Sequence, residues 1–347
     1  MSAPSSIFLV GPTASGKSAV ALALAEKLGG EIISVDSMQV YRGLDLGTAK
    51  ATAGERARVP HHLIDVVGLT EPFDVAKFVA LARLAEADIQ ARGRTPIFCG
   101  GTGFYLKAYL EGLGDVPPSD AQLRAELQAT PLEQLLRELE QRDPVAYERI
   151  DRQNPRRVIR ALEVIRLTGQ TFSAQRPEWQ PVGKAESGKQ KAESEITAAL
   201  PNPQSPILNP QSSITRCPAP SAAPTIYGLQ RPFPDLHARI NARVDEMFAH
   251  GLVEETRALL PHGLEQNETA MQAIGYRQVV EHLRGVRPLA ETVELVKIKT
   301  RQFAKRQMTW FRRQLAVEWI AADTGEDCEQ LADRIAPERR LQPGEAQ

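Results

Sequence analysis

The sequence has few cysteines, no long apolar run and almost no net charge, and each shortage excludes a class of protein. The three cysteines, Cys99, Cys217 and Cys328, lie far apart and form no C-x-x-C pair, which argues against a zinc knuckle or a disulfide framework. No continuous apolar stretch approaches the length that spans a bilayer. With 42 basic and 43 acidic residues, any nucleic-acid site must be a local patch. We expect a cytoplasmic protein that does not enter a membrane, and a monomer by default.

A phosphate-binding loop stands near the start of the chain. Residues 7–18 read IFLVGPTASGKS, and they match G-x-x-x-x-G-K-[ST] between an apolar run and an Ala/Leu-rich helical pattern. Backbone N–H groups of such a loop face a diphosphate or triphosphate, while its lysine neutralises phosphate oxygens and its hydroxyl ligates Mg²⁺. The predicted loop residues are Gly11, Pro12, Thr13, Ala14, Ser15, Gly16, Lys17 and Ser18, with Ser18 as the metal ligand. The pattern specifies a phosphate chain but does not specify ATP.

Two further strand ends carry polar side chains. Asp36 follows the β-branched run at residues 31–35, and Thr102 lies in the glycine-rich turn after a strand expected at 95–99. Ligands of open parallel sheets bind outside the carboxyl ends of the strands, so both residues should share a crevice with the loop. Asp36 could hold Mg²⁺ through water, act as a general base, or only cap the strand. For Thr102 the alternative is a turn that merely needs glycine conformations.

Two arginines follow the last expected core strand, at residues 226–229. In the helical pattern after it, Arg239 and Arg243 lie four residues apart beside an apolar stripe. Paired guanidinium groups in that place could clamp a buried diphosphate. Alternatively they form ion pairs with Asp235 or Glu246.

The patterns predict an α/β fold: a P-loop NTPase-like parallel sheet flanked by helices, with a helical insertion and a helical C-terminal part. The expected units are an α/β core at 1–114, a helical insertion at 115–153, a basic helix returning to the core at 154–176, a disordered Pro/Ser/Gln-rich insertion at 177–225, the rest of the core at 226–322, and a loose tail at 323–347.

Two basic helices suggest contact with RNA. A positive cluster at the N-terminus of the first opposes the helix dipole, and a phosphate backbone could compensate for it, although a solvated basic face is the alternative. That cluster consists of Arg156, Arg157 and Arg160. The last long helix carries lysines and arginines with Phe303, Trp310 and Phe311 interleaved, a combination typical of RNA recognition. Its aromatic residues, taken alone, are also typical of a protein core.

Taken in order, the segments GPTASGKS, VDSMQVYRGLDLGTAK, GGTGFYL, NPRRVIRALEV, AIGYRQ and TRQFAKRQMTWFR resemble the tRNA dimethylallyltransferase family, also called tRNA isopentenyltransferases. The resemblance spans residues 5–320 except the insertion near 177–225. It is to the bacterial type, because no Cys/His set follows Trp319, where eukaryotic relatives often carry a zinc finger. It implies transfer of a dimethylallyl group from dimethylallyl diphosphate to N6 of the adenosine 3′ of the anticodon, at position 37.

The resemblance also implies roles for particular residues. Asp36 would be the catalytic base, with Lys17, Ser18, Arg243 and Thr102 completing the catalytic set, and either Arg239 or Arg243 would clamp the diphosphate. The implied contacts with the anticodon stem-loop are Asp36, Ser37, Met38, Gln39, Thr102, Arg156, Arg157, Val158, Ile159, Arg160, Gln272, Ala273, Ile274, Gly275, Tyr276 and Arg277. The helical insertion would grip the anticodon stem, and the target base would be flipped out of its stack.

Two alternatives remain at this point. A P-loop kinase of a nucleotide or small metabolite would keep the fold but use ATP. A non-catalytic RNA-binding protein would keep the loop only as structure, and the intact Lys17, Ser18 and Asp36 argue against it.

Overall fold

A computed structural model describes residues 4–114, 116–175 and 224–336. Its centre is a six-stranded sheet, and every paired strand runs parallel to its neighbour. In spatial order the strands are β3 (His61–His62), β2 (Glu31–Val35), β4 (Pro96–Gly100), β1 (Ile7–Val10), β5 (Ile226–Gln230) and β6 (Val317–Ala321). The predicted parallel α/β fold is therefore confirmed. The proposed disordered insertion lies, apart from 224–225, outside the described residues.

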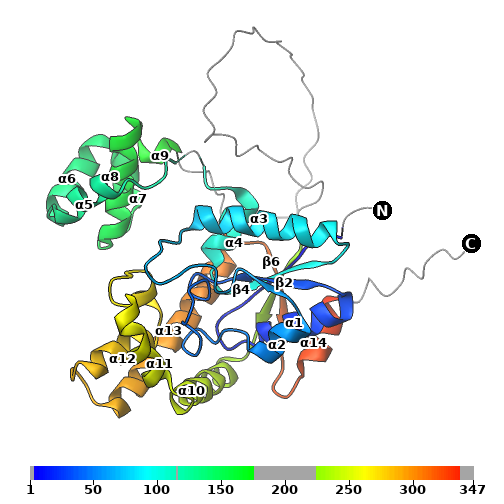
Figure 1. Ribbon diagram of the computed structural model, residues 1–347. Coiled ribbons are helices and arrows are strands. Elements are labelled where there is room, and N and C mark those ends of the chain that lie inside the picture. The colour runs from blue at the N-terminus through cyan, green and yellow to red at the C-terminus, as the bar shows by residue number, and fades with distance from the viewer. Residues whose placement is uncertain (1–3, 115, 176–223, 337–347) are drawn as a thin grey trace, which may run out of the picture.

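Helices cover both faces of the sheet (Figure 1). Along β1, Phe8 and Val10 face one apolar cluster while Ile7 and Leu9 face the other, as the two-residue period of a strand requires. The first face packs on α3 (Val75–Ala91) and α4 (Gly103–Glu111), and the second packs on α1 (Lys17–Leu28) and α14 (Cys328–Ile335). The short α2 (Ala53–Arg58) begins with a complete capping box from Thr52 and Glu55.

The C-terminal helices lie beside the carboxyl edge of the sheet (Figure 1). They are α10 (Phe233–Ala249), α11 (Leu252–Leu259), α12 (Tyr276–Leu283) and α13 (Leu289–Gln314), with 3₁₀ turns at Leu260–His262 and Ala270–Gln272. The 26-residue α13 packs against α10, α12 and α4, so it joins the C-terminal part to the first half of the chain.

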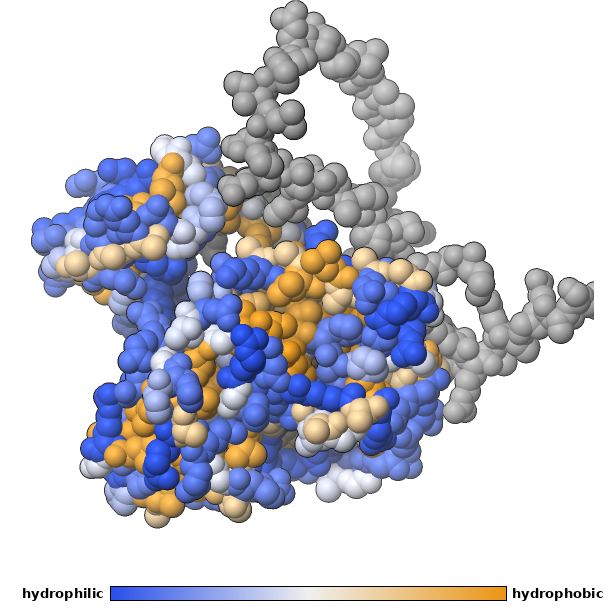
Figure 2. Space-filling model, viewed as in Figure 1, coloured by the Kyte–Doolittle hydropathy of each residue, from blue (hydrophilic) through white to orange (hydrophobic). Residues whose placement is uncertain are grey.

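The insertion forms a lobe with its own apolar core. It contains α5 (Ala121–Ala129), α6 (Leu132–Arg142), α7 (Pro144–Arg149), α8 (Pro155–Thr168) and α9 (Phe172–Gln175). The prediction that 154–176 returns to the core is wrong, because Val158, Ala161 and Leu162 of α8 pack on α5 and α6. An apolar stripe predicts that a helix face is buried but does not specify its partner. Figure 2 shows a mostly hydrophilic surface on this lobe.

The expected loose tail is also corrected in part. Residues Cys328–Ile335 form α14, which begins with a capping box from Asp327 and Gln330. Leu331, Ala332 and Ile335 are buried against α1, so this helix completes one face of the core. No helix in the described part of the chain is long and apolar enough to cross a bilayer.

Candidate active site

The predicted phosphate-binding loop joins β1 to α1 at the carboxyl edge of the sheet. Gly16 caps α1 with a φ of 97°, and Ala14 adopts a φ of 63°, a left-handed conformation that is costly for a residue with a side chain. Ser15 Oγ is buried and has no hydrogen-bond partner in the described structure. A strained loop with a buried unpaired hydroxyl fits a site built to face a polar ligand.

Asp36 and Thr102 lie at neighbouring strand ends, as predicted. Asp36 Oδ1 accepts hydrogen bonds from the backbone N–H groups of Met38 at 2.8 Å and Gln39 at 3.3 Å. Thr102 Oγ1 accepts from the Ser37 N–H at 3.1 Å, and the Thr102 N–H donates to Val35 O at 3.1 Å. The strands β2 and β4 pair in register up to Val35 and Gly100, so their turns begin side by side. The hydrogen bonds of Thr102 then fix the two turns to each other.

Charge and burial tune the groups in this crevice. Burial raises the pKa of Asp36, while its two backbone hydrogen bonds and the nearby Lys17 and Arg243 oppose the rise. Burial likewise lowers the pKa of Lys17 and of Arg243, and Asp36 opposes both shifts. A carboxylate with a raised pKa is a better proton acceptor than an exposed aspartate.

Two arginines contact the predicted phosphate-binding loop. Arg239 Nε donates to Ala14 O at 3.0 Å, and Arg231 Nε donates to Ser15 O at 2.8 Å. A Cβ placed on Gly16 would lie 3.6 Å from Arg231 Nη2 and 3.8 Å from Arg239 Nη2, so both guanidinium groups lie over the loop. Arg231 also pairs with Asp235 at 3.2 Å, whereas neither Arg239 nor Arg243 pairs with any described carboxylate. The alternative of ion pairs to Asp235 or Glu246 is therefore wrong for those two arginines.

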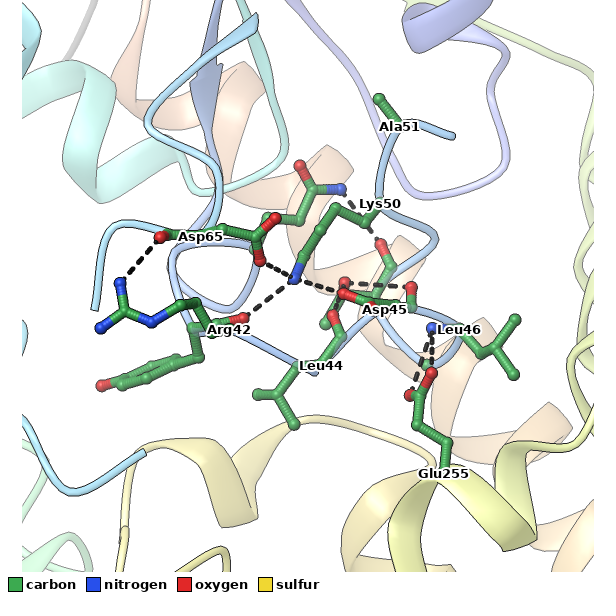
Figure 3. Close-up of polar contacts among 12 residues, drawn as sticks. Arg42, Leu44, Asp45, Leu46, Lys50, Ala51, Asp65 and Glu255 are labelled. Atoms are coloured by element: carbon green, nitrogen blue, oxygen red, sulfur yellow. Dashed lines mark hydrogen bonds and ion pairs between the residues drawn. The ribbon is translucent and has the colours of Figure 1, made fainter. Parts of the chain in front are cut away.

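The segment that carries Asp36 is held by a buried lysine (Figure 3). The Nζ of Lys50, whose side chain is 2% exposed, contacts Asp45 and Asp65 at 2.6 Å each and donates to Tyr41 O at 2.9 Å. Farther along the segment, Leu46 N–H donates to Glu255 of α11 at 3.0 Å. The turn after β2 is thereby fixed to the C-terminal helices.

These elements enclose a pocket of about 520 Å³. Its polar lining includes Thr13, Asp36, Thr102 and Arg243. Its apolar lining comes mostly from α10, α13 and the turn before α12, with Ile240, Val244, Met247, Ile274, Val296 and Phe303. A pocket that combines charged and apolar side chains suits an anion attached to a short hydrocarbon.

Four of the side chains expected to contact RNA have partners within the protein. Val158 and Ile159 lie in the core of the insertion. Gln39 uses its amide within its own segment, where it accepts from Ser34 Oγ at 2.8 Å and donates to Thr48 O at 3.1 Å. Tyr276 is fully buried and bonds to Glu255 and to Gly47 N–H. The expectation of RNA contact by these four side chains does not fit their surroundings.

The basic cluster on α8 is likewise divided. Arg160 pairs with the buried Glu163 at 2.7 Å and donates to Pro117 O at 2.6 Å, so a carboxylate of the insertion balances its charge. Arg156 pairs with Glu268 across to the C-terminal part at 3.0 Å. Arg157 is exposed. Of the residues expected before α12, Gln272, Ala273 and Ile274 line the pocket. Gly275 directly precedes α12. Arg277 is exposed and pairs with Glu281 at 3.2 Å.

Sequence reasoning missed two residues of this site. Arg231 directly follows β5, at the same edge where Asp36 and Thr102 follow their strands, and that position is a signal that could have found it. Gln307 of α13 reaches between the turns after β1 and β4. No local pattern marks it, since its partners lie 294 and 206 residues away.

Comparison with known proteins agrees with this geometry. The family model described as IPP transferase matches residues 39–314, and the one described as isopentenyl transferase matches residues 5–69. The tRNA dimethylallyltransferase 1 of Trichlorobacter lovleyi is 43% identical over 322 residues, covering 92% of this chain and 94% of that protein. The chain belongs to the tRNA dimethylallyltransferase family.

Other members of the family agree. The tRNA dimethylallyltransferase of Geobacillus thermodenitrificans is 43% identical, covering 90% of this chain and 89% of its own. The crystal structure of a tRNA isopentenylpyrophosphate transferase from Bacillus halodurans is 35% identical and covers 97% of this chain and 96% of its own, with a TM-score of 0.62. Membership of the tRNA dimethylallyltransferase family, whose members are prenyltransferases, supports that activity rather than the kinase or the non-catalytic alternative.

Proposed function

We propose that this protein transfers the dimethylallyl group of dimethylallyl diphosphate to N6 of the adenosine at position 37 of tRNA. The single observation that carries the proposal is the pocket, whose lining combines the half-buried Asp36 carboxylate, Thr13 and Ala14 of the predicted phosphate-binding loop, and apolar side chains. Family membership supplies the substrate class, because the relatives are named for it.

The donor diphosphate would lie against the loop at residues 11–18. Its negative charge grows as the bond between the prenyl C1 and oxygen breaks, and the electron pair remains on the diphosphate. Lys17, the loop N–H groups and the arginines above the loop are placed to stabilise that charge. Arg243 faces Asp36 in the pocket, whereas Arg239 contacts Ala14 O, so we assign Arg243 to the reacting centre and Arg239 to the loop.

The acceptor amine is a weak nucleophile and needs a base. As N6 bonds to C1, its proton would pass to the Asp36 carboxylate, whose raised pKa favours that transfer. Thr102 and Ser37 are hydrogen-bonded to each other beside Asp36, and Gln272 and Ile274 line the same pocket. These four residues and Met38 are the contacts we propose for the flipped nucleotide.

Mg²⁺ fits this site only as a partner of the diphosphate. Ser18 lies exposed in the first turn of α1, and no described group of three or more His, Cys, Asp or Glu residues could hold a metal. Ser18 would supply one hydroxyl, and phosphate oxygens and water would complete the octahedral shell that Mg²⁺ prefers. When bound, the ion would neutralise part of the leaving group's charge.

A basic groove on the outer face of α13 supports an RNA partner. It is lined by Lys305, Arg306, Trp310 and Arg313 and lies beside the pocket, with which it shares Arg306 and Trp310. Lys305, Arg306 and Arg313 have no carboxylate partner among the described residues. Unpaired cations next to an aromatic ring match the demands of a phosphate backbone and unstacked bases.

The test is a prenyl-transfer assay with purified protein, Mg²⁺ and an unmodified anticodon stem-loop that has adenosine after the anticodon. Dimethylallyl diphosphate and ATP are supplied in separate reactions, and the RNA mass is measured. We expect a gain of one prenyl group with dimethylallyl diphosphate alone. No gain, with ATP consumed instead, would refute the proposed donor and acceptor.

A further inference from the structure

One side chain connects the turn after β1 to the turn after β4, and both turns line the pocket. Gln307 of α13 is 7% exposed and points between the loop after β1 and the turn after β4. Its Oε1 accepts a hydrogen bond from the Thr13 N–H at 2.8 Å, and its Nε2 donates to Gly101 O at 2.9 Å. The residue also lines the pocket.

The two partners determine the orientation of the amide. Thr13 offers a backbone donor and Gly101 a backbone acceptor, so the oxygen must face Thr13 and the nitrogen must face Gly101. Asparagine and glutamine are the side chains that present one fixed acceptor and one fixed donor on the same planar group, and glutamine has the longer reach. A carboxylate or an ammonium group would satisfy one partner and leave the other unsatisfied.

Direct backbone hydrogen bonds do not join these turns. The strands β1 and β4 pair up to Val10 and Gly100, and beyond that point no backbone hydrogen bond links residues 11–16 to residues 101–103 in the described structure. The loop at 11–18 faces the proposed diphosphate. Gly101 directly precedes Thr102, one of the contacts proposed for the acceptor nucleotide. Beyond the paired ends of β1 and β4, the hydrogen bonds of Gln307 therefore link the two halves of the site.

We propose that Gln307 is a positioning residue that sets the distance between the loop at 11–18 and the turn at 101–103, which carries Thr102. The inference rests on the proposed function, since it concerns the alignment of the two substrates for in-line transfer. Both substrates can bind to a misaligned site, but the amine and the prenyl C1 then meet at the wrong separation.

Gly101 is shaped for this contact. A Cβ built on Gly101 would lie 2.4 Å from Gln307 Nε2, closer than real contacts allow. The φ of Gly101 is not positive, so the backbone itself would accept an alanine. The glycine is required here by the close approach of the Gln307 amide.

The first experiment compares Gln307→Met with Gln90→Met. Gln90 lies on α3, where its Nε2 donates to Pro4 O at 3.1 Å, and it does not line the pocket or the basic groove on α13. We expect Gln307→Met to lower kcat for prenyl transfer roughly 10- to 100-fold, while stem-loop affinity is unchanged. Gln90→Met should keep the wild-type kcat even if both variants lose similar thermal stability.

A second measurement does not depend on prenyl transfer. Titration with inorganic diphosphate and Mg²⁺ should show affinity about fivefold weaker in Gln307→Met, the effect of one lost hydrogen bond holding the loop, and unchanged in Gln90→Met. If the wild type transfers no prenyl group, the proposed function fails, and this titration still decides the role of Gln307 at the loop.

A double-mutant cycle tests the contact itself. Gly101→Ala should lower kcat because its Cβ displaces the amide, and Gln307→Ala should lower it by removing the amide. In the double variant the Cβ finds space, so kcat should equal that of Gln307→Ala. Additive losses in the cycle, an equal loss of kcat in Gln90→Met, or wild-type kcat and diphosphate affinity in Gln307→Met would each overturn the proposal.

Discussion

The Ser37 N–H donates to Thr102 Oγ1 at 3.1 Å, and this bond joins the turn after β2 to the turn after β4 directly beside Asp36. The Thr102 N–H returns a bond to Val35 O at 3.1 Å. The threonine therefore contributes to the geometry of the base as well as to the surface that the nucleotide would meet.

Replacement of Thr102 by valine should lower kcat/KM for the stem-loop roughly tenfold, because the Ser37 N–H loses its acceptor. Thr102→Ser keeps the hydroxyl and should remain close to wild type. Steady-state kinetics with varied stem-loop at saturating dimethylallyl diphosphate make the comparison. Equal activity of the valine and serine variants would contradict the importance of this bond.

Asp36→Asn should separate base chemistry from structure. Asparagine keeps an oxygen that can accept from the Met38 and Gln39 N–H groups but removes the charge. We expect kcat to fall roughly 10²- to 10⁴-fold, with little change in stem-loop affinity. Single-turnover rates and filter binding give the two quantities, and parallel losses in both would eliminate Asp36 as the base.

The pH profile of transfer follows from the direction of two shifts. Activity requires ionised Asp36, whose pKa is raised, so the acid limb of kcat/KM should lie above the pKa of an exposed aspartate and activity should fall as pH drops through it. Activity also requires charged Lys17, whose pKa is lowered, so the alkaline limb should lie below that of an exposed lysine. The Asp36→Asn variant should lose the acid limb, and its persistence would assign that limb to another group.

The three arginines near the loop should differ in what they affect. Arg243→Met should lower kcat roughly 10²- to 10³-fold without loss of stability, because Arg243 has no ion pair with a described residue and faces Asp36. Arg239→Met should affect mainly the KM for dimethylallyl diphosphate. Arg231→Met should destabilise the protein by about 3 kcal/mol, since it breaks a buried pair with Asp235. Steady-state kinetics and urea unfolding distinguish these outcomes. A greater loss of kcat in Arg239→Met than in Arg243→Met would reverse the assignment of Arg243 to the reacting centre.

Lys50 should be important for folding of the segment that carries Asp36. Lys50→Met removes the buried cation that Asp45 and Asp65 share and the donor to Tyr41 O, and it should cost about 2 kcal/mol of unfolding free energy. Arg42→Met removes an exposed pair with Glu71 in the same region and should cost under about 1 kcal/mol. Urea midpoints measure both, and similar small losses would show that the Lys50 cluster contributes little.

Much of the site could be predicted because its residues follow strands. The phosphate loop, Asp36 and Thr102 each stand just after an apolar run, and parallel strands align their carboxyl ends at one edge. Periodicity also located the helices, as with α1, which ends at Gly29 with a φ of 59°. These features depend on local patterns of a few residues.

The differences concern the partners that side chains meet in the folded protein. The stripe on α8 predicted burial, but it packs within the insertion, and Arg160 pairs with Glu163 of the same helix. Tyr276 and Gln39 have polar groups typical of a binding surface, yet Glu255 and the segment at 48–49 occupy them. A sequence records which groups can bond, and only the packing decides which partner is nearest.

The sequence by itself therefore determined the sheet, the phosphate loop, the catalytic candidates at the strand ends and the family. The tertiary structure decided which arginine faces Asp36, which polar residues are enclosed, and that Gln307 spans the two halves of the site. The physical reason is range: strand periodicity and loop conformation are set by near neighbours, whereas a hydrogen bond between Thr13 and Gln307 exists only after α13 has packed against the sheet.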